Sequence, residues 1–159
     1  MRVTSLVTRL RWLLPTGGTP AERIEMPLEI GHDHIALRVV DYDGTVAWYR
    51  EKLDFELDQE WPFADMRLAY MHNGSAKIEI LGGSTAEPQE QVDSLEPTFK
   101  HEGVNHFCLR VDDLDLTLAE LEARGVPLLG EAFVVEEIGR RLAFIKDNSG
   151  NRIEFSGPR

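Results

Sequence analysis

Two histidines and two glutamates occupy repeated places in this sequence. His34 and His106 each open an apolar run, while Glu79 and Glu154 each lie inside one. A carboxylate within a strand core is costly unless it is paired or bound to a metal. Two imidazoles and two carboxylates suit a divalent ion such as Ni, Zn, Co, Mn or Fe(II). The sequence therefore predicts one metal site with these four residues as ligands.

Such a site would support proton transfer. A metal that chelates two adjacent oxygen atoms acts as a Lewis acid and stabilises an enediolate. A neighbouring carboxylate can then take the proton from the carbon next to the carbonyl group. We expect Glu154 to be this base, with Glu79 as its partner on the other side. Return of the proton to the adjacent carbon makes an isomerase, whereas return to the same carbon makes an epimerase, and the ligands serve both.

Each of the four residues also has a structural explanation that requires no metal. A lone strand histidine is usually structural, and a lone strand glutamate usually faces solvent. The occurrence of both residue types in both repeats favours a shared site instead. His32 lies two residues before His34, on the same strand face. It could support the ligands or replace one, but we expect it to face solvent.

The repeat itself covers more than the ligands. Residues 31–47 align with residues 103–119 at an offset of 72. After the initial Gly31 and Gly103, the identical pairs are His34 and His106, Leu37 and Leu109, Arg38 and Arg110, Val39 and Val111, Asp41 and Asp113, Asp43 and Asp115, Thr45 and Thr117, and Ala47 and Ala119. An internal repeat changes the expected fold, because each half must form the same unit.

Each half shows the pattern β-α-β-β-β. A capping Asp41 or Asp43 begins the first helix, and Asp113 or Asp115 begins the second, which Gly125 ends. The first half predicts strands over 34–40, 55–60, 68–72 and 76–81, and a helix that runs to about residue 53. The second half predicts strands over 106–111, 126–135, 141–146 and 152–156, with a turn over 147–151.

The chain divides accordingly. We expect a first module over residues 28–81, a connecting loop over 82–102 and a second module over 103–159. Residues 1–27 differ, because an apolar helix face is followed by Pro15, Gly17, Gly18 and Pro20. This segment could be a targeting peptide or a membrane-surface helix, but we favour an arm that packs on the domain or on a second subunit.

Composition limits the partners. The net charge of −11 argues against nucleic acid, which requires a basic face. No apolar run reaches the length of a membrane span. Cys108 is the only cysteine, which indicates a reducing, cytoplasmic setting, and we expect it to be buried. A small molecule remains as the expected partner.

These residues resemble the vicinal-oxygen-chelate superfamily over about residues 30–157. The stretches 33–39 and 105–111 are similar to its first-strand signatures, and 144–154 is similar to its closing hairpin, with Asn148 where proline is common. The resemblance implies an α+β fold in which two β-α-β-β-β modules form a cupped mixed sheet around the metal.

The order His, Glu, His, Glu resembles metal-dependent glyoxalase I. That resemblance implies a lactoylglutathione lyase-like enzyme that acts on a small carbonyl or thiol-adduct substrate. Arg38, four residues after His34, matches an arginine that holds a glutathione carboxylate, although Gly83 replaces an asparagine that binds glutathione. The alternatives are an epimerase of acyl-CoA type, an extradiol dioxygenase using His34, His106 and Glu154, and a drug-binding resistance protein.

Assembly follows from the ligand count. One module offers only one histidine and one glutamate, so two modules must meet, within one chain or between two. The apolar stripe of residues 3–14 has nothing in its own segment to cover it, and such stripes usually mark interfaces. We therefore predict a homodimer with two metal sites.

Overall fold

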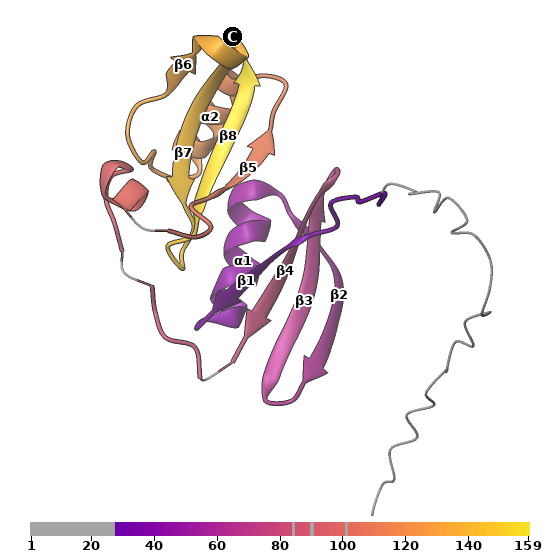
Figure 1. The fold of residues 1–159 in the computed structure, drawn as a ribbon. Helices are drawn as coiled ribbons and strands as arrows, with labels where there is room; N and C mark the ends of the chain where they lie inside the picture. Colours follow the sequence, from indigo (N-terminus) through magenta and orange to yellow (C-terminus); the bar gives the residue numbers. More distant parts are fainter. Residues whose placement is uncertain (1–27, 84, 90, 101) are drawn as a thin grey trace, which may run out of the picture. The chain divides into compact units, whose positions relative to one another are not determined.

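The first half of the chain folds into one four-stranded mixed sheet and a helix. A computed structural model describes residues 28–159 except 84, 90 and 101. The elements are β1 (Ile35–Val39), α1 (Tyr42–Leu53), β2 (Glu56–Phe63), β3 (Met66–Asn73) and β4 (Ala76–Gly82). The strand order is β1-β4-β3-β2 (Figure 1). Only β1 and β4 are parallel, because α1 carries the chain back across the sheet.

The second half repeats this topology. Its elements are β5 (Phe107–Arg110), α2 (Leu114–Ala123), β6 (Phe133–Val135), β7 (Arg140–Lys146) and β8 (Arg152–Pro158), with short 3-10 helices η1 (Glu96–Lys100) and η2 (Glu136–Ile138). The strand order is β5-β8-β7-β6, and β5 is parallel to β8. The predicted α+β fold of two β-α-β-β-β units is therefore confirmed.

One predicted strand is largely wrong. The sequence predicts a strand over 126–135, but β6 spans only Phe133–Val135, and an isolated bridge joins Leu128 to Ile145. Gly130 has a φ of 97°, a left-handed conformation that interrupts an extended strand. Val126 is buried, so its apolar character reflects core packing rather than strand pairing.

Both helices begin at an aspartate, as predicted. The Asp41 carboxylate accepts a hydrogen bond from Gly44 N at 2.9 Å, and that of Asp113 accepts one from Leu116 N at 2.9 Å. These bonds satisfy N–H groups that have no partner in the first helical turn. Of the two aspartates considered for each cap, the first serves in both modules. No described helix is long and apolar enough to cross a membrane.

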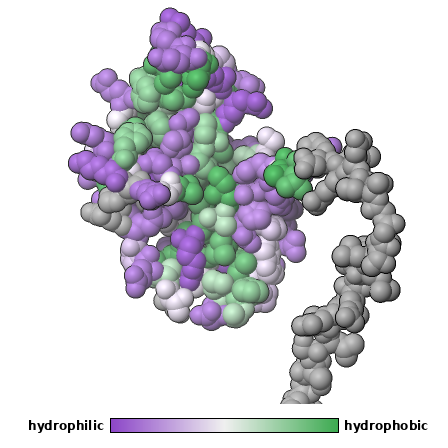
Figure 2. Space-filling model, in the orientation of Figure 1, coloured by the Kyte–Doolittle hydropathy of each residue, from purple (hydrophilic) through white to green (hydrophobic). Residues whose placement is uncertain are grey.

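Strand alternation separates a core face from an open face. Leu37 and Val39 of β1, with Ile78 and Ile80 of β4, pack in one cluster with Tyr49 of α1. The corresponding core residues of the second module are Phe107, Leu114, Leu121, Ile153 and Phe155. The residues between them on each strand point to the opposite face. Some hydrophobic side chains remain exposed among hydrophilic ones on the face seen in Figure 2.

The two modules meet through reciprocal hydrogen bonds. Residues His32–Arg159 form one compact unit. Within it, Lys52 Nζ donates to the Arg124 carbonyl at 2.6 Å, and Arg124 Nη1 donates to the Lys52 carbonyl at 3.2 Å. These residues are separated by the repeat offset of 72. The contact is therefore reciprocal: equivalent residues of the two repeats donate to each other's carbonyl groups.

Candidate metal centre

The first histidine and glutamate of the predicted set lie side by side. His34 immediately precedes β1, and Glu79 lies in β4, which pairs directly with β1. His34 Nε2 is 3.3 Å from Glu79 Oε2. The Glu79 side chain is 13% exposed. Because Ile78 and Ile80 point into the core, Glu79 must point to the open face.

The second pair has the same arrangement. His106 immediately precedes β5, and Glu154 lies in β8. His106 Nε2 is 3.1 Å from Glu154 Oε2, and the Glu154 side chain is again 13% exposed. The parallel pairing of β5 with β8 brings these residues together, as β1 and β4 do in the first module. The repeat in the sequence is thus a repeat of His–Glu pairs.

The spacing within each pair fits a shared ion. Histidine nitrogens and carboxylate oxygens bind Zn²⁺-like ions at about 2.0–2.2 Å, so neighbouring donors on one ion lie about 3 Å apart. The separations of 3.3 Å and 3.1 Å match this value. Each pair could therefore supply two adjacent ligands to one divalent ion.

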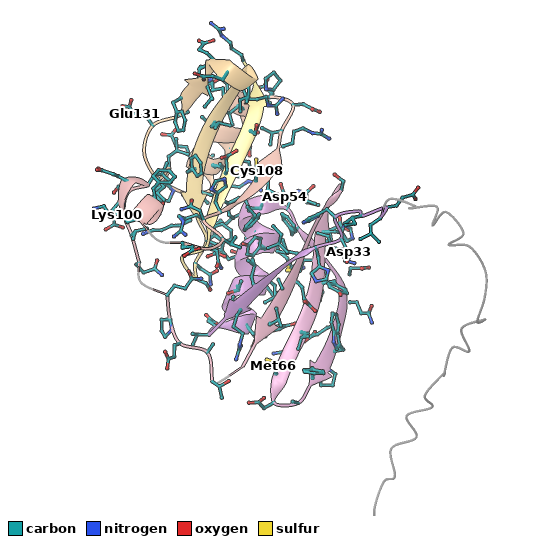
Figure 3. All side chains as sticks on the ribbon, in the orientation of Figure 1. Asp33, Asp54, Met66, Lys100, Cys108 and Glu131 are labelled. Atoms are coloured by element: carbon teal, nitrogen blue, oxygen red, sulfur yellow. The ribbon has the colours of Figure 1, made fainter. Side chains whose placement is uncertain are left out.

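Both histidines are also held through their other ring nitrogen. His34 Nδ1 is 2.6 Å from Asp33 Oδ2, and His106 Nδ1 is 3.0 Å from Asn105 Oδ1. Figure 3 labels Asp33 beside the start of β1. The bond to His34 and the nearby Lys77 charge lower the pKa of Asp33. Metal-binding histidines commonly donate from the second nitrogen to such an acceptor.

Aromatic rings flank both pairs, a feature that the sequence analysis missed. In the first module the Tyr70 ring lies 5.2 Å from His34 and 4.7 Å from Trp61. In the second, the Phe144 ring lies 5.1 Å from His106 and 6.3 Å from Phe133. The strand register explains this placement, because Tyr70 pairs with Glu79 and Phe144 pairs with Glu154. Aromatic residues at matching strand positions were the available signal.

The four predicted ligands do not form one cluster within the chain. Over residues 28–159, leaving aside 84, 90 and 101, no group of three or more His, Cys, Asp or Glu side chains could hold an ion. The structure thus brings His34 to Glu79 and His106 to Glu154, but not the two pairs to each other. Within the described residues, the structure thus shows two separate His–Glu pairs.

Arg38, the predicted substrate-binding residue, contacts the protein itself. Its guanidinium donates to the carbonyl oxygens of Leu81 at 2.9 Å and Gly83 at 3.3 Å, and to Thr85 Oγ1 at 3.2 Å. These bonds hold the chain where it leaves β4. Arg110, the repeat partner of Arg38, is exposed.

Cys108 and His32 both lie near the His–Glu pairs in the sequence. The expectation that Cys108 is buried is wrong, because strand alternation places it on the open face, where it is exposed (Figure 3). Desolvation and the adjacent Glu154 carboxylate raise the pKa of Cys108 to about 12, so its thiol is not an activated nucleophile. His32 is exposed before β1, as expected.

The chain is similar to known proteins. The family model for the Glyoxalase/Bleomycin resistance protein/Dioxygenase superfamily matches residues 31–155. YraH of Bacillus subtilis is 30% identical over 123 residues, which cover 76% of this chain and 93% of that protein. The mitochondrial methylmalonyl-CoA epimerase of Homo sapiens is 21% identical over 127 residues, covering 77% and 71%.

The fold has a matching solved structure. A glyoxylase/bleomycin resistance protein/dioxygenase domain from Frankia sp. EAN1pec superposes with a TM-score of 0.67 and 18% identity, covering 83% of this chain and 94% of that one. The ordered repeat, the two mixed sheets and the family match agree with one another. The chain belongs to the Glyoxalase/Bleomycin resistance protein/Dioxygenase superfamily.

Proposed function

We propose that this protein is a metal-dependent enzyme that moves a proton at a carbon next to a carbonyl group of a small molecule. The observation that carries the proposal is the pair of His–Glu contacts, at 3.3 Å and 3.1 Å, in matching places of both modules. Their spacing suits adjacent ligands of one ion. A drug-binding protein without chemistry would not require this duplicated donor set.

The roles of the residues follow from their chemistry. A divalent ion held there would act as a Lewis acid toward two adjacent substrate oxygens. His34 and His106 are the fixed ligands, because each is held through Nδ1 by Asp33 or Asn105. Glu154 accepts the proton at a carboxylate oxygen and returns it, while Glu79 lies on the opposite side of the substrate. The aromatic rings beside each pair favour a substrate with an apolar or planar portion.

Two reactions share this first step. A glyoxalase-type isomerase returns the proton to the neighbouring carbon, and an epimerase returns it to the same carbon from the other face. The hydrogen bonds of Arg38 to Leu81 and Gly83 argue against its holding a glutathione carboxylate. The similarity to methylmalonyl-CoA epimerases supports the epimerase as the second candidate.

A complete site requires a second copy of the chain. Each His–Glu pair supplies two donors, and the described residues of one chain form no larger cluster. We therefore propose a homodimer in which His34 and Glu79 of one subunit meet His106 and Glu154 of the other. By twofold symmetry this arrangement produces two sites.

The free sheet edges offer a way to assemble it. β1 and β5 are each an outermost strand, with hydrogen-bonding groups available on one side. An open groove of about 810 Å³ lies beside β5 and is lined by both modules of the same chain, with Ile35 and Phe55 from the first and Phe107 and Leu109 from the second. We propose that the second copy joins along the outer sides of the edge strands β1 and β5.

The test combines metal content with isotope exchange. Purified protein should retain a divalent metal, and the His34→Ala/His106→Ala double variant should lose most of it. In D₂O, a glyoxalase-type isomerase should leave deuterium on the former carbonyl carbon, which receives the proton, whereas an epimerase should leave it on the carbon next to the carbonyl group. Suitable compounds are the hemithioacetal of methylglyoxal and a 2-methyl-branched acyl-CoA. Equal metal content in the double variant and wild type would exclude the proposed site.

A further inference from the structure

The loop between the modules contacts the second half-site through one amide side chain. Asn105 Nδ2 donates to the carbonyl oxygen of Thr98 at 3.0 Å and lies 3.2 Å from Thr98 Oγ1. Thr98 belongs to η1 and is only 4% exposed. On its other side, Asn105 Oδ1 lies 3.0 Å from His106 Nδ1. η1 is therefore connected to a predicted metal ligand through Asn105.

The network allows only one orientation of the Asn105 amide. The Thr98 hydroxyl donates to the Leu95 carbonyl at 2.6 Å, so its oxygen can only accept from Asn105. The Thr98 carbonyl is also an acceptor. Turning the amide around would place its oxygen against two acceptors, so the NH₂ group must face Thr98 and Oδ1 must face His106.

The orientation of the amide favours a proton on Nδ1 of the imidazole. Because Oδ1 is an acceptor, neutral His106 must carry its proton on Nδ1 to form this bond. Glu154 Oε2, 3.1 Å from Nε2, is also an acceptor and favours a proton on Nε2, so Asn105 and Glu154 compete for the proton of the metal-free ring. With the proton on Nδ1, Nε2 presents its lone pair toward Glu154. A metal ligand requires that lone pair. We propose that Asn105 is a positioning residue that selects the Nδ1–H tautomer of His106, and that Thr98 of η1 sets the orientation of Asn105.

In the first module, a carboxylate takes the place of the Asn105 amide. Asp33, the repeat partner of Asn105, has only acceptor atoms when ionised, so its carboxylate favours Nδ1–H on His34 in any rotamer. It needs no partner that orients it, and its side chain is 71% exposed. An amide has an incorrect orientation available, and the buried Thr98 excludes it. The binding of a metal ion by His106 rests on the proposed function, whereas the tautomer of His106 does not.

The experiment measures the tautomer directly. Long-range ¹H–¹⁵N NMR of the full-length, metal-free protein at about pH 8, where an ordinary imidazole is neutral, distinguishes Nδ1–H from Nε2–H. The share of Nδ1–H at His106 should be larger in wild type than in Asn105→Leu, because the amide opposes the Glu154 carboxylate. Asn105→Leu should shift His106 toward Nε2–H and weaken Zn²⁺ binding, measured against a chelator, by about 10–100-fold. Asn105→Asp should keep the tautomer, because a carboxylate oxygen still accepts from Nδ1, but should lower the free energy of unfolding, since its second oxygen faces the two Thr98 acceptors.

Two further variants make the test specific. Thr98→Val should reduce the Nδ1–H preference of His106, because one acceptor for the amide is lost. In the first module, Asp33→Asn should change His34 less, because Lys77 Nζ, 3.5 Å from Asp33 Oδ2, favours an amide oxygen at the same place. If Asn105→Leu fails to fold, Asn105→Asp and Thr98→Val still decide the matter.

The outcomes separate this inference from the proposed function. An Nδ1–H share at His106 that is the same in wild type, Asn105→Leu and Thr98→Val would overturn the positioning role. A tautomer that shifts as expected in a protein that binds no Zn²⁺ would leave the positioning role intact and reject the metal site.

Discussion

Glu154 lies in β8 with a largely buried side chain whose Oε2 is 3.1 Å from His106. Replacing it with glutamine keeps the shape but removes the basic oxygen. We expect Glu154→Gln to fold normally, to retain metal through the remaining ligands, and to lose roughly 10²-fold or more in turnover, the usual scale of general-base catalysis. Deuterium exchange next to the substrate carbonyl should fall in parallel.

The matched control is Glu79→Gln in the other half-site. Its effect on turnover should be smaller if Glu154 alone is the base. Wild-type exchange in Glu154→Gln, together with strong loss in Glu79→Gln, would assign the base to Glu79 instead.

A variant of Arg38 distinguishes a substrate-binding role of this residue from a structural role. Its hydrogen bonds to Leu81 and Gly83 fix the end of β4. Arg38→Ala should therefore lower the free energy of unfolding by about 1–3 kcal/mol, the cost of leaving such groups without partners. Urea denaturation measures this loss. An unchanged stability with a strongly raised KM would restore the substrate-binding role predicted from the sequence.

For single residues, the sequence predicted which side chains lie at the site but not which groups they contact. The matched positions of His34, Glu79, His106 and Glu154 predicted one site with four ligands, whereas the described residues of one chain bring them together only as two His–Glu pairs. The other role of Arg38 could not be predicted, because its acceptors are carbonyl groups, which every residue carries. The partner of His106 on Nδ1 was equally hidden, since it depends on how the connecting loop folds.

Among the elements, α1 and the β7–β8 turn are joined through the buried Asp147. Asp147 is 4% exposed, and its carboxylate accepts hydrogen bonds from Ser149 N and from Asn151 N and Nδ2, all within the turn. Its fourth donor is Tyr49 Oη in α1, at 2.9 Å. The turn before Glu154 is thus fixed by the helix of the other module.

Alkaline pH should test this connection. Burial, and then the Asp147 charge, raise the pKa of Tyr49 well above 10. Above pH 10 the unfolded chain loses the tyrosine proton while the folded protein retains it, so stability falls as pH rises. The slope for one such group is roughly 1.4 kcal/mol per pH unit. Tyr49→Phe should remove its share of this slope, measured by urea denaturation between about pH 9 and 11.

At neutral pH the same variant should cost about 1.5–3 kcal/mol, because a hydrogen bond to a buried carboxylate is lost. Tyr42 supplies the control, since its pKa is also raised, to about 12, mainly by burial. Some pH dependence should therefore remain in Tyr49→Phe. An unchanged slope would show that Tyr49 ionises equally well in the folded protein.

The elements themselves were mostly predictable. Alternating apolar residues and the aspartate caps indicated both helices and seven of the strands, with ends shifted by a few residues. The exception was the segment before β6. Val126 and Leu129 are apolar and buried there, so the local sequence looks like a strand. These side chains pack in the core of the module, and a local sequence pattern does not show which residues they contact.

For the whole molecule, mixing two inactive variants tests the shared site. A His34→Ala chain and a His106→Ala chain are each expected to be inactive alone. In a mixed dimer with sites built from both subunits, one site lacks both histidines and the other lacks neither. Random mixing should therefore restore about one quarter of the wild-type sites.

No recovery after verified subunit exchange would show that each site draws its ligands from one chain. The predicted helical arm falls outside the described residues, so its role in the dimer stays a prediction. Light scattering on the full chain, and on one beginning at Leu28, measures it. A monomer at micromolar concentration would reject the homodimer.

The reciprocal bonds between Lys52 and Arg124 suggest a history for this fold. Each residue donates to the carbonyl of its counterpart in the other repeat, as two identical molecules do across a symmetry axis. An ancestral protein half this length could have made the same contact with its own twin. Duplication and fusion of its gene would have preserved that contact while freeing each copy to diverge, as Asp33 and Asn105 have done.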